Sequence, residues 1–187
     1  MLQLPHRVEL LCAALLTIAL GGCLTTTTAP GAFGGSSVTP FPEAKKTASN
    51  ARLRVVSREG VVRAIPQKGC LDDSASDTGV ILGGKGDLQG QSRNMPDPER
   101  IGDNPFAELY ITADKPFVLN FQVGPESRAR CALAGSFIPQ EGKDYEAYAT
   151  ISEGKCALTV RIRNLASGLW KPERLIPAKS CKQNVRK

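Results

Sequence analysis

The near absence of histidine is the strongest limit on the chemistry that this chain can perform. The 187 residues include one histidine, His6, near the start. Residues 7–187 therefore cannot supply a Ser-His-Asp or Cys-His nucleophile system, an imidazole acid or base, or a histidine-containing metal site. Cysteines and carboxylates are the main residue types left for chemistry.

Two sequence motifs resemble functional sites but lack essential residues or evidence that their residues meet. Residues 79–85 have the glycine and lysine spacing of a phosphate-binding loop, but Gly86 stands where Ser or Thr would hold Mg²⁺. We therefore expect no nucleotide ligand. A Gly/Pro-rich loop over residues 84–106 carries Asp97, Glu99 and Asp103. Paired carboxylates can hydrolyse glycosides, but nothing in the sequence brings these together, so we expect no enzyme activity and no cofactor.

The start of the chain has the three parts of an export signal. A basic start at residues 6–7, an apolar run over residues 10–20 and two glycines precede Cys23. The run is too short to span a bilayer, which needs about 20 apolar residues. Leu20-Gly21-Gly22-Cys23 resembles the lipobox of bacterial lipoproteins, which implies cleavage before Cys23 and its acylation as a membrane anchor. Leu24 stands where that family's inner-membrane retention signal has Asp, so the resemblance implies an outer-membrane protein facing the periplasm of a Gram-negative cell.

Composition divides the chain into three parts. Residues 1–22 are the expected signal peptide. Residues 23–50 are rich in Thr, Gly, Ser, Pro and Ala, and we expect a flexible tether there, because such a segment buries too little apolar surface to offset its ordering entropy. Residues 51–187 are the expected folded domain, which is about the size of a single domain.

The sequence of residues 51–187 predicts a series of short strands and no helix. β-Branched and alternating segments are separated by Gly, Pro, Asp and Ser, which is typical of antiparallel sheets. We therefore expect an all-β fold, an antiparallel sandwich or a partly open barrel, with the first two strands forming a hairpin or one bent strand. The expected strands are Leu53–Val56, Gly60–Ile65, Val80–Leu82, Glu108–Thr112, Phe117–Val123, Ala129–Ile138, Asp144–Ser152 and Lys155–Arg163.

Four cysteines lie in this domain: Cys70, Cys131, Cys156 and Cys181. No two of them have the close spacing of typical zinc ligands, so no metal site is expected. An even number in an exported domain favours two disulfides, for which three pairings exist. Cys131 lies on the same strand face as Leu133. Cys156 likewise shares a face with Leu158, which favours bonds between Cys131 and Cys156 and between Cys70 and Cys181.

The first of these bonds constrains the topology. Disulfides join Cα atoms about 4.4–6.8 Å apart, whereas two strands with a third between them lie roughly 9–10 Å apart. In a simple three-strand meander, the strand over residues 144–152 would lie between the strands that carry Cys131 and Cys156, and the bond could not form. The strand over 144–152 must leave that sheet, or the cysteines must face each other from different sheets, which favours a sandwich.

A second resemblance covers about 30 residues. The order Cys131, Phe137-Ile138-Pro139, Gly142, Tyr145 and Cys156 is similar to a pattern of small bacterial envelope lipoproteins of the β-sandwich type, most of which have no assigned activity. The resemblance implies the fold and supplies no function.

Basic residues are concentrated at both ends of the domain. Residues 43–63 carry six basic and two acidic side chains, and residues 171–187 carry six basic and one acidic. This pattern favours either a surface near anionic lipid or docking onto an acidic partner. Few aromatics are available for base stacking, so nucleic acid is not expected, and Trp170 is expected in the core. The candidate partner-binding residues are Arg161, Arg163, Lys171 and Arg174.

The sequence therefore predicts a lipid-anchored, non-enzymatic envelope protein that acts as an interaction or assembly module. Its expected partners are the membrane, through the N-terminal lipid, and an envelope protein or cell-wall component. The alternative is a periplasmic inhibitor or ligand-binding module, for instance one that blocks a cell-wall hydrolase with the loop at residues 84–106.

Overall fold

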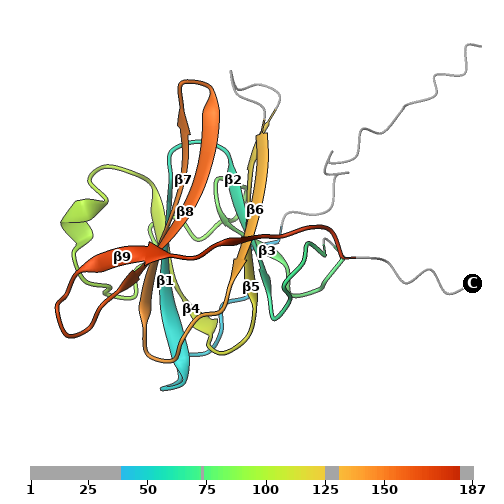
Figure 1. Cartoon of the computed structure of the whole chain (residues 1–187). Helices are drawn as coiled ribbons and strands as arrows, with labels where there is room; N and C mark the ends of the chain where they lie inside the picture. The colour runs from blue at the N-terminus through green and yellow to red at the C-terminus, as the bar shows by residue number, and fades with distance from the viewer. Residues whose placement is uncertain (1–38, 73, 125–130, 182–187) are drawn as a thin grey trace, which may run out of the picture. The chain divides into compact units, whose positions relative to one another are not determined.

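A computed structural model describes residues 39–72, 74–124 and 131–181 (Figure 1). The one helix in this part has three residues, so no described helix is long and apolar enough to cross a bilayer. Cys23 and the expected signal peptide lie outside the described residues. The elements in chain order are β1 (Asn50–Ser57), β2 (Val61–Pro66), β3 (Gly79–Leu82), η1 (Pro98–Arg100), β4 (Phe106–Thr112), β5 (Phe117–Val123), β6 (Cys131–Phe137), β7 (Asp144–Ser152), β8 (Lys155–Arg163), β9 (Trp170–Glu173) and β10 (Ile176–Pro177).

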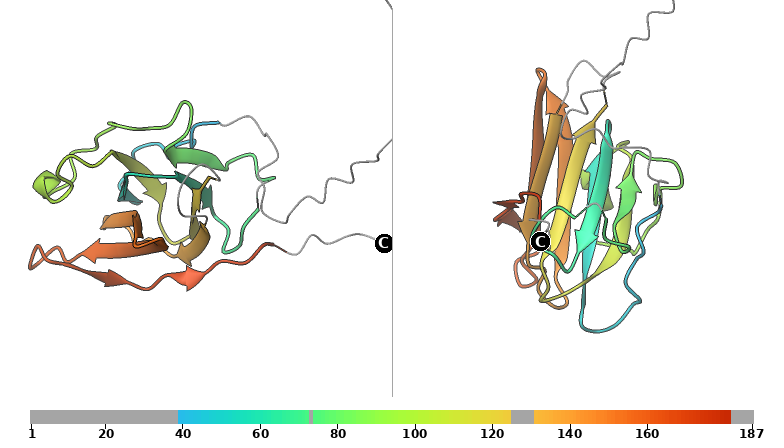
Figure 2. Two further views of the ribbon diagram at one scale, coloured as in Figure 1. Left: turned by 90° about the horizontal axis from the view of Figure 1, so that it is seen from above. Right: turned by 90° about the vertical axis from the view of Figure 1, so that its right-hand side faces the viewer.

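The strands form two five-stranded sheets packed face to face (Figures 1 and 2). The first sheet has the order β4-β1-β7-β8-β9, and the second has the order β10-β6-β5-β2-β3. The expected all-β sandwich is confirmed. Its pairings are antiparallel except for that of β1 with β7, which is parallel. The first sheet is therefore mixed. The parallel pair is possible because a long stretch of chain separates β1 from β7, as the crossover between parallel strands requires.

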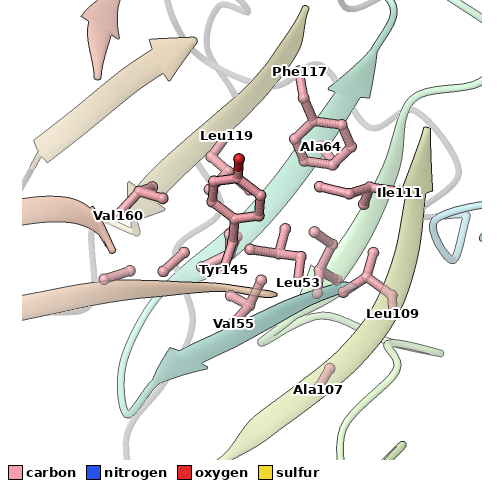
Figure 3. Packing of buried hydrophobic residues seen from close by; sticks show 14 of the residues in the cluster. Leu53, Val55, Ala64, Ala107, Leu109, Ile111, Phe117, Leu119, Tyr145 and Val160 are labelled. Carbon is pink, nitrogen blue, oxygen red and sulfur yellow. The ribbon is translucent and has the colours of Figure 1, made fainter. Parts of the chain in front are cut away.

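The core lies between the sheets and follows from the alternation of side chains along each strand. Leu53 and Val55 of β1 enter the core with Leu119 of β5, and all three are fully buried (Figure 3). Fully burying such a side chain contributes about 2 kcal/mol. Arg52 and Arg54 alternate with these residues on β1 and therefore lie on the opposite, outer face of the first sheet.

Both expected disulfides are confirmed. Cys131 in β6 bonds to Cys156 in β8, with Cα atoms 6.4 Å apart. These strands belong to different sheets, which is one of the two arrangements that the disulfide geometry allowed. Cys70 bonds to Cys181, with Cα atoms 5.1 Å apart, and the amide of Cys181 donates to the carbonyl of Leu71 at 2.8 Å. This second bond holds the end of the described chain against the loop that follows β2.

Residues 39–49, which the composition assigned to the tether, pack against the sandwich. Phe41 is 5% exposed and joins the core, where its ring lies edge-on to Phe117. The amide of Phe41 donates to the carbonyl of Val80 at 2.9 Å, and the amide of Val80 donates to Thr39 at 2.9 Å. One buried aromatic residue stabilises this segment despite its polar composition. The folded domain therefore begins by residue 39 rather than at residue 51.

The first two strands form neither of the expected arrangements, a hairpin or one bent strand. β1 belongs to the first sheet and β2 to the second, so the turn between them carries the chain from one sheet to the other. Gly60 ends this turn at a φ of 76°, and a side chain there would overlap the carbonyl of Gln122. The turn therefore requires glycine.

Candidate functional site

Charged side chains alternate with core residues on three neighbouring strands of the first sheet. Arg54 of β1 lies opposite Glu108 of β4 on one side and Glu146 of β7 on the other. Arg52 of β1 lies opposite Asp144 of β7. Opposite charges on adjacent strands attract each other, so this outer face is organised by ion pairs.

Arg54 is the centre of these ion pairs. Its side chain is 0% exposed, and those of its partners Glu108 and Glu146 are 3% and 0% exposed. Its Nε donates to Oε1 of Glu108 at 2.9 Å, and its Nη1 donates to Oε1 of Glu146 at 2.7 Å. Charges this deeply buried are tolerated only when all their hydrogen-bonding atoms find partners, because desolvation of each ion costs several kcal/mol.

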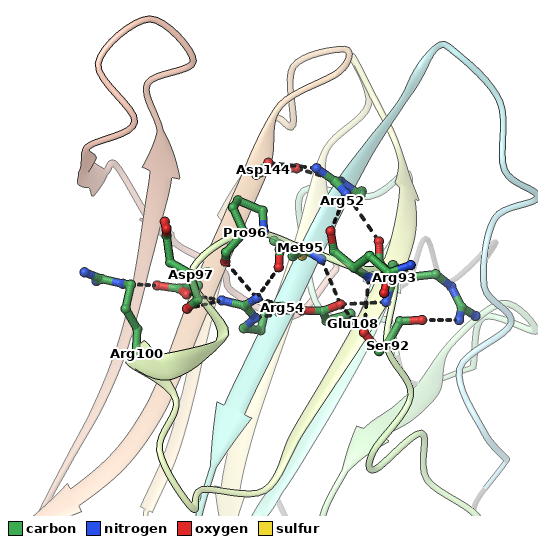
Figure 4. Close-up of polar contacts among 12 residues, drawn as sticks. Arg52, Arg54, Ser92, Arg93, Met95, Pro96, Asp97, Arg100, Glu108 and Asp144 are labelled. Carbon is green, nitrogen blue, oxygen red and sulfur yellow. Dashed lines mark hydrogen bonds and ion pairs between the residues drawn. The ribbon is translucent and has the colours of Figure 1, made fainter.

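The remaining partners come from the covering loop, which we define as residues 83–105. This loop crosses the outer face over β1 (Figure 4). Arg54 Nη2 donates to the carbonyls of Met95 at 3.1 Å and Pro96 at 2.9 Å. Arg52 Nη1 donates to the carbonyls of Arg93 at 3.2 Å and Asn94 at 3.1 Å. The two arginines of β1 therefore bind the backbone of the loop directly.

Glu108 completes the attachment from the neighbouring strand. Its Oε2 accepts hydrogen bonds from the amides of Arg93 at 2.6 Å and Met95 at 3.2 Å and from the hydroxyl of Ser92 at 2.9 Å. Burial acts to raise the pKa of this carboxyl, but the hydrogen bonds from the two amides, Arg54 and Ser92 lower it below its usual value. Glu108 is therefore an ionised structural anchor, not a group prepared to donate a proton.

The N-terminal segment holds the other side of the covering loop. Glu43 forms an ion pair with Arg93 and accepts a hydrogen bond from Gln91 Nε2 at 2.9 Å. Its Oε1 also accepts the amide of Tyr110 on β4 at 2.7 Å. The half of the outer face over β4 and β1 is therefore covered by the loop, and the free edge of β4 is occupied.

The part of this face around Thr150, Thr159 and Arg161 remains open, and residues 97–100 of the covering loop reach β9 at its border. We call it the basic face and define it by Arg100, Tyr148, Thr150, Thr159, Arg161, Arg163 and Trp170. The guanidinium of Arg161 lies 5.8 Å from the centre of the Tyr148 ring, and that of Arg100 lies 5.8 Å from the centre of the Trp170 ring. Each is a cation–π contact.

Asp97 of the covering loop positions two members of the basic face. Its Oδ2 accepts a hydrogen bond from Trp170 Nε1 at 2.8 Å and lies 3.5 Å from Arg163 Nε. The hydrogen bond from Trp170, followed by the charge of Arg163, outweighs desolvation and lowers the pKa of Asp97. An ionised Asp97 therefore orients Trp170 and offsets part of the positive charge of Arg163 and Arg100.

The basic face contains an open hollow of about 470 Å³, lined by Arg100, Tyr148, Thr150, Thr159 and Arg161. Tyr148 donates its hydroxyl to Oε2 of the buried Glu146 at 3.2 Å. Burial and the adjacent carboxylate raise the pKa of Tyr148, so its phenol stays neutral. The exposed arginines and the threonine hydroxyls give the hollow the chemistry of an anion-binding surface.

A second hollow adjoins the basic face at the turn between β8 and β9. Its lining includes Arg163, Lys143, Lys171 and Leu165. Leu165 is 55% exposed and Leu169, in the same turn, is 69% exposed. The tip of this hairpin therefore presents apolar surface next to positive charge.

The structure brings some of the expected residues together and separates others. Arg161 and Arg163 lie on the basic face, and Lys171 lines the adjoining hollow. Arg174 is exposed beyond the end of β9, outside this face. Trp170, expected in the core, lies on the outer face with Asp97, because its indole N–H requires an acceptor.

The glycine-rich motif and the loop carboxylates singled out in the sequence do not form a catalytic or ligand site in the part of the chain that the structure describes. Residues 79–82 form the buried strand β3 rather than a phosphate-binding loop. Glu99 and Asp103 are exposed, whereas Asp97 is engaged with Trp170. Among the described residues, no group of three or more His, Cys, Asp or Glu side chains could hold a metal ion.

Sequence reasoning missed Arg54, Glu108, Glu146, Arg100 and Tyr148. The signal for the first three was present, because each is a charge flanked by buried residues at alternating positions of a strand. Arg100 had no comparable signal, since the path of the covering loop brings it to β9. Comparisons with protein-family models and with curated proteins found no match for this chain.

Proposed function

We propose that this protein is a lipid-anchored, non-enzymatic component of a Gram-negative cell envelope that binds an acidic partner through the basic face. The two disulfides indicate an oxidising location outside the cytoplasm. The resemblance of residues 20–23 to a lipobox supports acylation at Cys23 and outer-membrane sorting.

The observation that carries the proposed interaction is the division of one sheet face into two halves. The covering loop occupies the half over β4 and β1, through contacts from Arg52, Arg54 and Glu108. Beyond the loop, the outer face of β7 and β8 is left open around Arg100, Tyr148 and Arg161, and Asp97 of the loop holds Trp170 at the edge of this open part. Arginine, tyrosine and tryptophan are the residues enriched in the energetic centres of protein interfaces.

The proposed anchor is tested by metabolic labelling with a radioactive fatty acid in cells that express the full chain. The wild-type protein should incorporate label and fractionate with outer membranes. A Cys23→Ser variant should neither incorporate label nor fractionate with outer membranes. Equal labelling of both proteins would contradict the anchor.

The proposed interaction is tested by co-purification from envelopes after mild crosslinking. A double variant, Arg161→Glu and Arg163→Glu, reverses two charges on the basic face and should lose the partner, because like charges across an interface cost several kcal/mol. The matched control, Lys115→Glu with Lys179→Glu, reverses two exposed charges elsewhere. Retention of the partner by the first variant would contradict this role for the basic face.

The alternative role, an inhibitor that inserts the loop at residues 84–106, has less support. The carbonyls of residues 93–97 accept hydrogen bonds from Arg52 and Arg54, and the amides of Arg93 and Met95 donate to Glu108. Insertion of this segment into a hydrolase would require breaking these buried contacts.

A further inference from the structure

We propose that the hollow between Arg100 and Arg161 binds a carboxylate on an acidic segment of the partner protein. This inference rests on the proposed function and names the chemistry of the partner. The hollow is the part of the basic face where two guanidinium groups, two threonine hydroxyls and a neutral phenol lie together.

Arg161 is the group with the most unused hydrogen-bonding capacity. Its side chain is exposed, and its contact in the described part of the chain is with the Tyr148 ring, not with a carboxylate. The centre of its guanidinium lies 5.8 Å from the centre of that ring, and no hydrogen bond or ion pair within the described residues uses its N–H groups. A planar guanidinium with free N–H groups matches a carboxylate in a bidentate manner.

Arg100 supplies the second positive charge and is held by its neighbours. Its Nε lies 3.5 Å from Oε2 of Glu146, and its guanidinium packs over Trp170. Its side chain remains 34% exposed at the rim of the hollow. Glu146 is already paired with Arg54, so it only partly neutralises Arg100. Because Glu146 and Trp170 hold Arg100 before binding, it loses less side-chain entropy when a carboxylate arrives.

The neighbouring leucines favour a protein segment over an acidic glycan or a lipid headgroup. Leu165 and Leu169 are exposed at the tip of the hairpin between β8 and β9. Arg163 lines the second hollow, at this hairpin, and also belongs to the basic face. A partner that covers both regions must offer carboxylates and apolar side chains close together. A polypeptide with interspersed Glu or Asp and Leu meets this requirement, whereas sugar rings carry no aliphatic side chains and the acyl chains of a lipid lie beneath its anionic headgroup rather than beside it.

Trp170 provides a direct readout, because it is the only tryptophan in the chain and packs against Arg100. The experiment titrates the full-length protein, in micelles of a neutral detergent, with a synthetic peptide of interspersed Glu and Leu residues. Parallel titrations use polygalacturonate, a carboxylated glycan, and mixed micelles that contain phosphatidylglycerol. The variants are Arg161→Ala, Arg161→Lys and the control Lys115→Ala, which removes one exposed charge between β4 and β5.

The peptide should shift Trp170 emission saturably at 0.15 M salt. Arg161→Ala should weaken its binding about tenfold, because a hydrogen-bonded charged contact is lost. Arg161→Lys should retain part of the affinity, and Lys115→Ala should match the wild-type protein. Equal weakening by Arg161→Ala and Lys115→Ala, or no saturable binding, would overturn the proposed carboxylate site. Tighter Arg161-dependent binding of the glycan or the anionic micelles would overturn the choice of a protein segment.

Failure here can be distinguished from failure of the proposed function. If the peptide does not bind but the double reversal of Arg161 and Arg163 still releases the co-purified partner, the basic face remains the interface and the carboxylate site is wrong. If the double reversal also has no effect, the proposed function is wrong as well.

Discussion

Replacing Arg54 with Met tests whether the buried ion pairs hold the covering loop on the sheet. The substitution preserves much of the side-chain volume and removes all the hydrogen bonds that Arg54 itself donates to Glu108, Glu146 and the loop carbonyls. Removing one member of a buried ion pair typically costs 3–5 kcal/mol. Because Arg54 is fully buried and serves two carboxylates, we expect the free energy of unfolding to fall by about 4 kcal/mol.

The assay is urea unfolding followed by circular dichroism and by the emission of Trp170. Hydrogen exchange at the amides of Arg93 and Met95 reports the loop separately, since both amides donate to Glu108. Exchange at these two positions should accelerate in the Arg54→Met variant under conditions where the core strands remain protected. Local release of the loop would then be visible before global unfolding.

Lys115→Met is the control for this prediction, because Lys115 is exposed outside the network and its replacement should change stability by less than about 0.5 kcal/mol. Arg52→Met should give an intermediate loss of about 2 kcal/mol, because its side chain is 31% exposed but pairs with the buried Asp144 and also donates to the loop carbonyls of Arg93 and Asn94.

Combining Arg54→Met with Glu108→Gln and Glu146→Gln should recover part of the lost stability, because no unpaired buried charge remains. A loss below about 1 kcal/mol for Arg54→Met, with unchanged exchange at Arg93 and Met95, would refute this role for Arg54.

Two further predictions concern pH and the disulfides. Because hydrogen bonds lower the pKa of Glu108, its contribution to stability is complete above the ordinary glutamate pKa and is lost as the pH falls through the lowered value. The urea midpoint should therefore decrease between pH 6 and pH 3, and less steeply in a Glu108→Gln variant; identical slopes would contradict this. Removal of the Cys70–Cys181 bond, which spans 111 residues, should destabilise the protein more than removal of the Cys131–Cys156 bond, which spans 25. The loop-entropy model gives about 5 and about 3.5 kcal/mol, and the reverse order in thermal unfolding of the two double Cys→Ser variants would contradict it.

The sandwich and the disulfides could be predicted because they depend on local alternation. Each strand face is encoded by every second residue, so Cys131 and Cys156 could be assigned to inward faces before their sheets were known. The distance limit of a disulfide then excluded a simple meander and left two arrangements, of which the structure has the one with the two strands in different sheets. Both steps use only short stretches of sequence and covalent geometry.

The parts that could not be predicted depend on contacts between distant segments. The parallel pairing of β1 with β7 has no local signal, since either direction satisfies the same alternation. β9 and β10 were missed because they are short edge strands that contain Pro172 and Pro177, and proline disfavours assignment to a strand. Phe41 was missed because one aromatic residue is diluted in a polar segment.

The candidate site was predicted only in part for the same reason. Arg161 and Arg163 alternate with inward aliphatic residues of β8, so their outward orientation could be read from the sequence. Arg100 reaches the same face only because Arg54 and Glu108 fix the path of the covering loop. No property of the sequence around Arg100 encodes that path.

The central claim is that the open half of the first sheet's outer face is where the protein meets its partner. The most direct measurement is photo-crosslinking in living cells from an amino acid analogue placed at Thr159, which lies exposed within the hollow. The same analogue at Lys115, outside the basic face, is the control. We predict one dominant envelope-protein adduct from Thr159 that is lost when Arg161 is replaced by Glu, and none from Lys115. An adduct from Lys115 with none from Thr159 would contradict the account.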